Sequence, residues 1–539
     1  MPRLTVPPNF TGTAGDDTIV GEDLNKFPAI GIDILTGGFI DTGLGLDTIK
    51  GNGTSGKGAD GAIGKNVNGS EGGAGIGISN NGNLNAGSGD DDIISNGIGG
   101  LGGNGTDEPT VDSGTNGGGG GTGTGISNSG KLNTGLGNDT IISNGTGGNG
   151  GNGGGYFTAG GGGGTGTGIS NSGKLNTGLG NDTIAGTGQG GTGNDSRYGG
   201  YSGFGTGISN TGQLDTGEGK DTITGIGIAG IPGSGILIGN GGVGTGISNN
   251  GNLNTGAGND TIAGIGIASI PGNGIILGTG GVGTGISNNG NLNTGAGNDT
   301  IAGTGTGTGT GTGVINSKKL DTGDGEDTII GTGTSTGNFD DKINDGTGIQ
   351  NMKGATITTG QGNDTITGSG KGLVPDLIVI GISNDGVIDT GNGCDILTGL
   401  ASTTIDSNYG NPTGTAIGIF GQGTIRTGDG NDFITATSTI NEVQQKVTIG
   451  GGIGIDLGTG NDYFKGFGTG TVDGGKGFDT LDLSAFNRSE LTFSGVISGN
   501  ALNPANISFN NNKNVITLST TGFENFIFAD GSLNYSTLV

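Results

Sequence analysis

The sequence predicts an all-β protein: an elongated parallel β-solenoid, of the β-helix or β-roll kind, with Gly-rich inserts and a small C-terminal β cap. Three observations predict this fold. A G-x-G-x-D turn recurs along the 539-residue chain, apolar residues keep fixed distances from it, and the length variation falls between the copies. A stack of like coils accounts for all three, since each coil buries the same few positions against its neighbours.

The composition argues against an ordinary globular core. The chain has 142 Gly, no Trp and only 28% hydrophobic residues, too few for a large Leu- and Phe-rich interior. Because each Gly costs backbone entropy on folding, order has to come from repetition, backbone hydrogen bonds or bound ions.

The charge excludes several classes of partner. Lys and Arg total 20 against 47 Asp and Glu, a net charge of -27, so we expect no nucleic acid and no anionic membrane as partners. Cations are favoured instead. The absence of His and the single Cys394 remove the commonest general base and any internal disulfide. No apolar run reaches membrane-spanning length, so we expect no membrane insertion.

The repeat is anchored on the last acidic residue of each turn. GTGISNSGKLNTGLGNDTI occurs twice, GTGISNNGNLNTGAGNDTI also occurs twice, and weaker copies run from end to end. Spacing between anchors varies: it is 48 residues from Asp91 to Asp139, 39 from Asp182 to Asp221 and 28 from Asp299 to Asp327. The fourteen anchors are Asp17, Asp47, Asp91, Asp139, Asp182, Asp221, Asp260, Asp299, Asp327, Asp364, Asp395, Asp432, Asp462 and Asp479.

Inside a copy the register is constant. Before Asp139, for example, Ile126 lies 13 residues upstream and Leu132 seven upstream, and Ile141 follows two residues later. We expect a strand with the first Ile, a Ser-Asn-x-Gly corner, a strand with the Leu, the glycine turn, and a third strand with Thr-Ile. Stacking then places Ile on Ile, Leu on Leu and Asn on Asn. In the copy at Asp364, Ile349 stands two residues too early.

The segments between copies are Gly-rich, such as GTGGNGGNGGGYFTAGGGGG. They are either loose surface loops or extended polyglycine-like legs, the second suggested by the three-residue period of GGNGGNGG. Five aromatic residues in them are candidates for packing the legs or marking a contact surface: Tyr156, Phe157, Tyr198, Tyr201 and Phe204.

The glycine turn has the chemistry of a calcium site. Glycines allow a tight turn whose carbonyl oxygens point inward, and Asp adds a hard anionic oxygen of the kind that Ca²⁺ accepts. Stacked Asp carboxylates about 5 Å apart would otherwise repel one another by ~1 kcal/mol per pair in water. We therefore expect all fourteen anchor Asp residues to bind multiple Ca²⁺ ions that bridge neighbouring coils.

The turns resemble a known repeat. TAGDDTI, TGLGNDTI, TGDGNDFI and GGKGFDTLDLS are similar to the hemolysin-type (RTX) repeat GGxGxDxUx. The resemblance implies Ca²⁺ binding in a parallel β-roll and export by type I secretion. The family has tandem nonapeptides, two per coil, and only Asp462 and Asp479 approach that spacing, so we expect a wider coil here.

The pattern divides the chain into three parts. Residues 1–10 are a lead, 11–482 the repeat solenoid, and 483–539 a Phe-richer cap with alternating apolar and polar residues. The last part resembles the C-terminal region of proteins exported by type I secretion, whose signal is uncleaved; the alternative is a cap alone. The first coil has no such cap, which predicts self-association into filaments or sheets.

The repeats leave no room for a catalytic domain, so we expect no enzyme. The leading interpretation is a secreted Ca²⁺-binding structural protein of a bacterial cell exterior, in a surface layer, sheath or matrix fibre, with cell-surface polysaccharide as a candidate partner. The alternative is a Ca²⁺-dependent adhesin or ice-binding module. Its basis is a row of stacked threonines, Thr134, Thr177, Thr216, Thr255 and Thr294, matched by Ala86, Thr359 and Thr427 in other copies.

Overall fold

The structure is a computed structural model that is built almost entirely of β-strands. It describes residues 2–62, 67–106, 114–155, 158–235, 240–270, 279–337, 345–372, 378–404, 414–498, 501–511 and 514–538. The chain forms two compact units. Unit 1 comprises residues 1–292, 302–311 and 336–344, and unit 2 comprises 293–301, 312–335 and 345–539. Both are parallel β-solenoids, as the sequence predicts.

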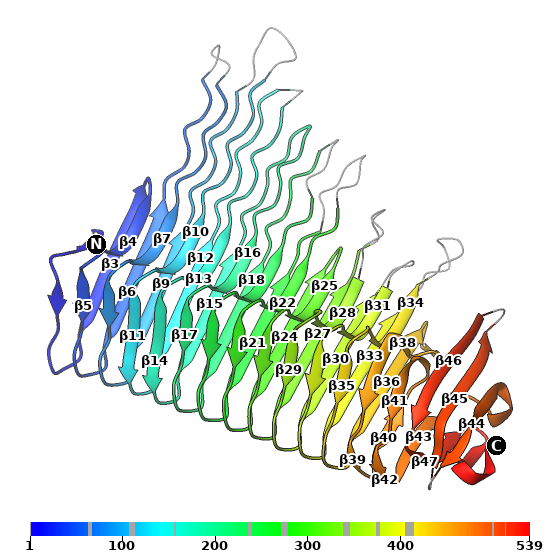
Figure 1. Cartoon of the computed structure of the whole chain (residues 1–539). Helices are drawn as coiled ribbons and strands as arrows, with labels where there is room; N and C mark the ends of the chain where they lie inside the picture. Colours follow the sequence, from blue (N-terminus) through cyan, green and yellow to red (C-terminus); the bar gives the residue numbers. More distant parts are fainter. Residues whose placement is uncertain are drawn as a thin grey trace. The chain divides into compact units, whose positions relative to one another are not determined.

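Each coil of unit 1 contains three strands, joined by a corner and by the glycine turn (Figure 1). The first strands are β1 (Leu4–Val6), β4 (Ala29–Ile34), β7 (Gly75–Asn80), β10 (Gly123–Asn128), β13 (Gly166–Asn171), β16 (Gly205–Asn210), β19 (Gly244–Asn249) and β22 (Gly283–Asn288). The second strands are β2 (Phe10–Thr11), β5 (Phe39–Asp41), β8 (Asn83–Asn85), β11 (Lys131–Leu136), β14 (Lys174–Leu179), β17 (Gln213–Asp215) and β20 (Asn252–Asn254). The third strands are β3 (Thr18–Lys26), β6 (Thr48–Ser55), β9 (Asp92–Ile98), β12 (Thr140–Thr146), β15 (Thr183–Gln189), β18 (Thr222–Ile228) and β21 (Thr261–Ile267).

Unit 2 repeats this order. Two strands, β23 (Asn291–Asn293) and β24 (Thr300–Gly307), have residues in both units. The following coils contain β25 (Gly311–Asn316), β26 (Lys319–Asp321), β27 (Thr328–Ser335), β28 (Asp345–Asn351), β29 (Thr356–Thr358), β30 (Thr365–Gly372), β31 (Ile378–Asn384), β32 (Val387–Asp389), β33 (Ile396–Thr403), β34 (Thr415–Phe420), β35 (Thr424–Arg426) and β36 (Phe433–Ile440). The last coils contain β37 (Val443–Gln444), β38 (Ile449–Asp456), β39 (Thr459–Gly460), β40 (Tyr463–Lys465), β41 (Gly468–Asp473), β42 (Lys476–Gly477) and β43 (Asp479–Leu483).

Stacked coils place like residues on like. In unit 1, Ile126 pairs in parallel register with Ile169, and Leu132 with Leu175. These side chains are fully buried, as are their equivalents in the other coils. In unit 2, Ile349 pairs with Ile382, so the two extra residues of that copy lie in its corner and leave the core register unchanged. The predicted register is confirmed except in the copy at Asp47. There Ile34, 13 residues upstream, was predicted to join the Ile row, but it pairs with Asn80, and Ile32 pairs with Ile78 instead because this corner also has two extra residues.

A buried asparagine ladder supports the corner. The Asn128 side-chain amide donates to Asn171 Oδ1 at 2.8 Å and to the Lys174 carbonyl at 2.9 Å. Each link satisfies two polar groups inside the coil, and an unsatisfied buried group costs about 1–3 kcal/mol. The Ser-Asn-x-Gly sequence therefore stacks the coils as well as turning the chain.

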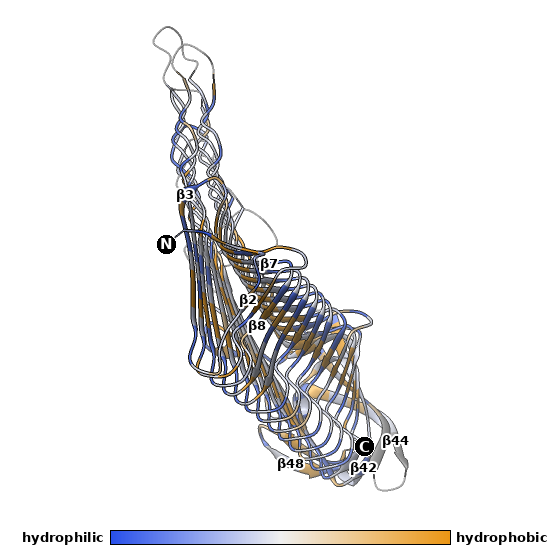
Figure 2. Cartoon of the chain, turned by 90° about the vertical axis from the view of Figure 1, so that its left-hand side faces the viewer, coloured by the Kyte–Doolittle hydropathy of each residue, from blue (hydrophilic) through white to orange (hydrophobic). Residues whose placement is uncertain are grey.

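The Gly-rich inserts form paired legs in the described residues, and Figure 2 shows those of unit 1 rising above β3 and β7. The Gly147 and Gly150 amides donate to the next outgoing leg, at Gln189 and Thr192, over 2.8 and 2.9 Å. The Gly148 amide donates to the Gly121 carbonyl of the preceding returning leg at 2.8 Å. Bonding to neighbouring legs at a three-residue period is a polyglycine arrangement, so of the two alternatives the legs are correct.

Antiparallel strands cover the end of unit 2. They are β44 (Leu491–Ser498), β45 (Ala501–Asn511), β46 (Asn514–Thr521), β47 (Phe523–Phe528) and β48 (Gly531–Asn534), with 3₁₀-helices η2 (Arg488–Glu490) and η3 (Tyr535–Thr537). Parallel pairing of β41 with β46 and of β43 with β47 joins them to the last coil. Phe467, Phe486 and Phe509 pack edge to face between them. This end of the stack is wider and aromatic because it has to bury a terminal coil.

The legs yield a matched test. A Cβ atom added at Gly121 would stand 2.0 Å from the Gly73 carbonyl oxygen, whereas one added at Gly119 meets nothing nearer than 3.7 Å. We expect Gly121→Ala to separate the legs locally, since overpacking costs about 1–3 kcal/mol or more. Amide hydrogen exchange should rise across residues 114–122 in Gly121→Ala and stay unchanged in Gly119→Ala. Equal exchange in the two variants would contradict the packed-leg description.

Candidate cation column of the glycine turns

The two glycines of each turn bring successive turns into close contact. Before Asp182, Gly178 and Gly180 have φ of 103° and 134°, a left-handed region that favours glycine. A Cβ atom on either would lie only 1.7 or 1.8 Å from the carbonyl oxygen of Gly135 or Gly137 in the preceding coil. The pattern G-x-G is therefore required both by the turn and by the stack.

All fourteen predicted Asp residues lie inside these turns, one above another within each unit. Asp17 is half-buried and the other thirteen are at most 1% exposed. The Asp139 amide donates to Asp182 Oδ1, and the Asp182 amide donates to Asp221 Oδ1, both at 2.8 Å. The same link joins Asp17 through Asp260 in unit 1 and Asp299 through Asp479 in unit 2, at 2.7–2.9 Å. The structure thus brings the predicted residues together as carboxylate ladders.

A second ladder runs beside the first in the opposite direction. The Asn181 amide donates to Asn138 Oδ1 at 2.9 Å, and the Lys220 amide donates to Asn181 Oδ1 at 2.7 Å. Here the side-chain oxygen belongs to the earlier coil, whereas in the Asp ladder it belongs to the later one. The Asn-Asp pair of the repeat therefore binds each turn to both of its neighbours.

One member of the ladder is absent from the sequence prediction. Glu524 in β47 accepts the Asp479 amide through Oε2 at 2.8 Å and so closes the ladder of unit 2. Glu524 is buried, at 8% exposure. Only half of the glycine turn precedes it. Gly522, with φ of 77°, lies two residues before Glu524, and Phe526 lies two residues after it, as the second glycine and the third apolar residue do in each copy, but Glu replaces Asp.

The second oxygen of these carboxylates is buried without a hydrogen bond. In the described part of the chain, Oδ2 has no partner in eleven of the Asp residues: Asp47, Asp91, Asp139, Asp182, Asp221, Asp327, Asp364, Asp395, Asp432, Asp462 and Asp479. A Thr hydroxyl lies close to most of these carboxylates and lowers the pKa of its Asp, but its one proton is shared: the Thr134 hydroxyl beside Asp139 also donates to the Thr177 carbonyl at 3.1 Å. A buried anionic oxygen without a partner is costly.

Burial consequently raises the pKa of the column. Desolvation raises the pKa of Asp91 and Asp364 from 3.8 to about 7, and that of Asp182 to about 6, against the opposing effect of their hydrogen bonds. In unit 2, burial also raises the pKa of Asp432 and Asp479 to about 7. Neighbouring carboxylates add to the shift. Near neutral pH the bare column is stable only if it holds protons or other cations.

The threonine row predicted for ice contact is stacked but buried. Thr134, Thr177, Thr216, Thr255 and Thr294 have no exposed surface, and neither do Thr359 and Thr427, while Ala86 is 1% exposed. The hydroxyls are used inside the coil, as in the 3.2 Å bond from Thr177 to the Thr216 carbonyl. The prediction of an exposed row was wrong, because these residues follow the buried Leu by two positions and so share its inward face.

The donor chemistry fits a hard divalent cation. Carboxylate and hydroxyl oxygens line the interior of the turn, and an unpartnered anionic oxygen recurs in coil after coil. Among the described residues, no three His, Cys, Asp or Glu side chains gather at one point that would hold a metal. Each turn supplies one carboxylate, so an ion held here has to be shared by neighbouring coils.

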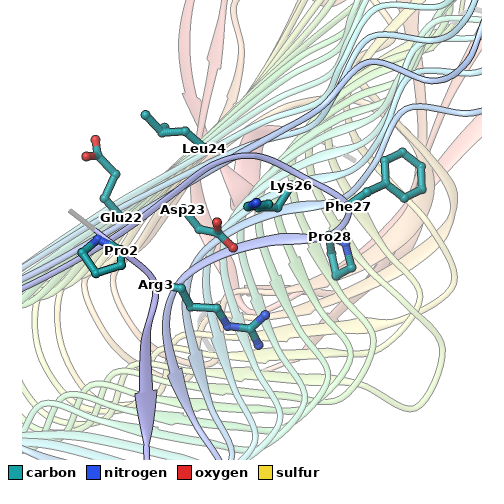
Figure 3. Close-up of a pocket in the computed structure, with 8 residues that line it drawn as sticks. All are labelled: Pro2, Arg3, Glu22, Asp23, Leu24, Lys26, Phe27 and Pro28. Atoms are coloured by element: carbon teal, nitrogen blue, oxygen red, sulfur yellow. The ribbon is translucent and has the colours of Figure 1, made fainter.

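A separate cavity of about 730 Å³ lies at the first coil of unit 1 (Figure 3). Arg3, Glu22, Asp23 and Lys26 are the charged residues that line it. Arg3 pairs with Asp33, and Asp23 Oδ2 accepts the Ile30 amide at 3.2 Å. These contacts hold β1, β3 and β4 together, and the cavity contains no Asp of the column.

Comparison with known proteins leaves the fold and this column as the basis for assigning a function: no family model and no curated protein matches the chain. Within the described ranges, no helix has the length and apolar character needed to cross a membrane.

The raised pKa values predict how pH acts on the metal-free protein. The folded carboxyls hold protons up to about pH 7, whereas the unfolded ones lose them near pH 3.8. The stability that these protonated carboxyls contribute is therefore complete below pH 3.8 and is lost as the pH rises through about 7. In chelator, circular dichroism should show the protein folded at about pH 5 and losing its β-structure as the pH rises to about 8. Equal β-structure at the two pH values would contradict a buried, protonated column.

Two substitutions at Asp221 distinguish the stabilising effect of the ladder hydrogen bond from the destabilising effect of the buried charge. Asp221→Asn keeps an oxygen for the Asp182 amide and removes the negative charge, so in chelator we expect it to stay folded to a higher pH than wild type. Asp221→Ala leaves that amide without an acceptor and, at about pH 5, where the metal-free protein is expected to fold, should destabilise it by about 1–3 kcal/mol. Circular dichroism against pH measures the first effect, and urea unfolding in chelator measures the second. If the two variants were destabilised alike, the cost of the buried charge would be disproved.

Proposed function

We propose that this protein is a secreted, Ca²⁺-binding structural protein of a bacterial cell exterior, one that folds and assembles when it binds Ca²⁺. The observation that carries the proposal is the row of buried, unpartnered Asp Oδ2 atoms in successive glycine turns. A hard divalent cation shared by neighbouring coils would satisfy these oxygens and balance their charge.

The rest of the coil gives Ca²⁺ a large share in folding. The apolar core is a narrow column, Gly opposes order, and burial raises the pKa of the carboxylates. When a metal site is absent from the unfolded chain, the binding free energy becomes folding free energy. Cytosolic Ca²⁺ is low, so such a chain would stay unfolded and exportable inside the cell and would fold outside. This coupling, together with the similarity to RTX repeats, is our reason for proposing secretion.

The role of the recurring polar residues supports a structural function. The recurring Asp, and the Asn and Thr found in most coils, form hydrogen bonds that stack one coil on the next. We therefore propose that the protein is not an enzyme and that it builds a surface layer, sheath or matrix fibre through contacts between copies. Cell-surface polysaccharide is a further candidate partner.

A calcium titration tests the proposal. Adding Ca²⁺ to chelated protein near pH 8 should produce β-structure cooperatively by circular dichroism. Mg²⁺ should not reproduce it, because Mg²⁺ demands a tighter octahedral site. Asp221→Ala and Asp260→Ala should each raise the Ca²⁺ midpoint several-fold.

Asp195 provides the control for these two variants. It lies in an exposed leg, where its Oδ1 accepts the Ser234 amide at 2.6 Å. Asp195→Ala should leave the Ca²⁺ midpoint near that of wild type. The Ca²⁺ proposal would be abandoned if chelated wild-type protein were already fully folded near pH 8 and unaffected by added Ca²⁺.

A further inference from the structure

Unit 1 has an uncharged outer surface on the third strands of its coils. In the seven-residue strands β9, β12, β15, β18 and β21, the second, fourth and sixth residues are buried in the coil. The other four residues of each strand face outward. Of these outward residues only Asp92 is charged, and the remainder are mainly Thr and Ile. We name this surface, together with the adjoining outgoing legs 99–102, 147–150, 190–193, 229–232 and 268–270, the Thr/Ile face.

Large apolar side chains are exposed together on this face. Six of them are between 39% and 62% exposed: Ile98, Leu101, Ile142, Ile231, Ile267 and Ile270. Contiguous exposed apolar surface of this kind usually marks an interaction site. In the legs the outward position recurs every third residue, so Leu101 and Ile231 extend the surface of the strands without a break.

The area of the face matches what a stable pair of proteins needs. Five strands about 4.8 Å apart give a width of about 24 Å, and seven strand residues give about 23 Å of length. Four leg residues add about 12 Å. The resulting area of about 800 Å² equals the surface that one partner buries in a typical specific complex.

Charge decides which partner fits. The chain carries a net charge of -27, so two copies repel unless they meet where charge is missing. The second strands of the same coils are unsuitable, since they expose Lys131 and Lys174. Flat sheet faces pack on each other about 10 Å apart, which suits a face whose rows of like residues repeat at the coil spacing.

We propose that the Thr/Ile face is the surface through which two copies of this chain pair, face to face about a two-fold axis. This inference rests on the self-association in the proposed function and identifies the surface responsible. In such a pair, the unit 1 solenoids of the two copies lie side by side, and the edges of their coils stay available for other contacts.

Sedimentation velocity of the full chain with millimolar Ca²⁺ tests the pairing. We expect wild type to associate and the double variant Ile142→Glu and Ile267→Glu to lose association by more than about tenfold, because four like charges would meet in the interface. The matched control is Leu136→Glu with Leu179→Glu. Those two leucines lie in the glycine turns and are exposed to a similar degree. Leu179 pairs through a β-bridge with Glu218, which occupies the same position in the next coil, so this position tolerates Glu.

A second measurement does not depend on added charge. In a Cys394→Ser background, Thr187→Cys on β15, the middle strand of the face, should form a disulfide-linked dimer on oxidation, and Ser209→Cys on β16 should not. Association of the Ile→Glu variant equal to wild type would overturn the inference while leaving self-association intact. If the wild-type protein stayed monomeric, both the proposed self-association and the pairing through this face would be disproved.

Discussion

Most of this structure depends on a carboxylate that is buried in every coil. Each Asp of the column accepts an amide from the neighbouring turn, and this bond spaces the glycine turns and aligns the Ile and Leu rows behind them. The same burial leaves Oδ2 without a partner and raises the pKa of the group. The ladder thus stabilises the stack through geometry and destabilises it through charge, and cations or protons have to resolve the conflict.

The glycines of the legs and those of the turns in unit 1 are required for the same reason. Stacked coils lie about 4.8 Å apart, so there is no space for a side chain wherever the Cα–Cβ bond would point along the stack toward the preceding coil. At Gly121 in a leg and Gly178 in a turn, an added Cβ would overlap a neighbouring carbonyl oxygen. The high glycine content is therefore a packing requirement, and the hydrogen-bonded legs recover part of the entropy cost that so much glycine brings.

Sequence reasoning predicted the parts of this fold that repeat. The spacing of Ile126, Leu132 and Ile141 from Asp139 was sufficient, because side-chain direction in a stacked strand depends on position alone. It missed Glu524, where only Gly522 of the glycine turn remains and Glu replaces Asp. It also placed the Thr134 row on the outside, although the row packs inside the coil. Tyr201 and Phe204 proved exposed, while Tyr156 and Phe157 lie outside the described residues. For the column, the residues were predicted, but the direction of its hydrogen bonds depends on the register between coils, which no single copy contains.

The central claim is that Ca²⁺ and protons compete for the same buried oxygens. The most direct test is calorimetric Ca²⁺ titration near pH 5.5, where protonation keeps the metal-free protein folded, in several buffers of different ionisation enthalpy. The account predicts that Ca²⁺ binding releases protons to the buffer, and that replacing column residues by Asn, as in Asp221→Asn, reduces the number released. Binding without proton release would contradict it, since Ca²⁺ would then occupy groups that are already ionised outside the column.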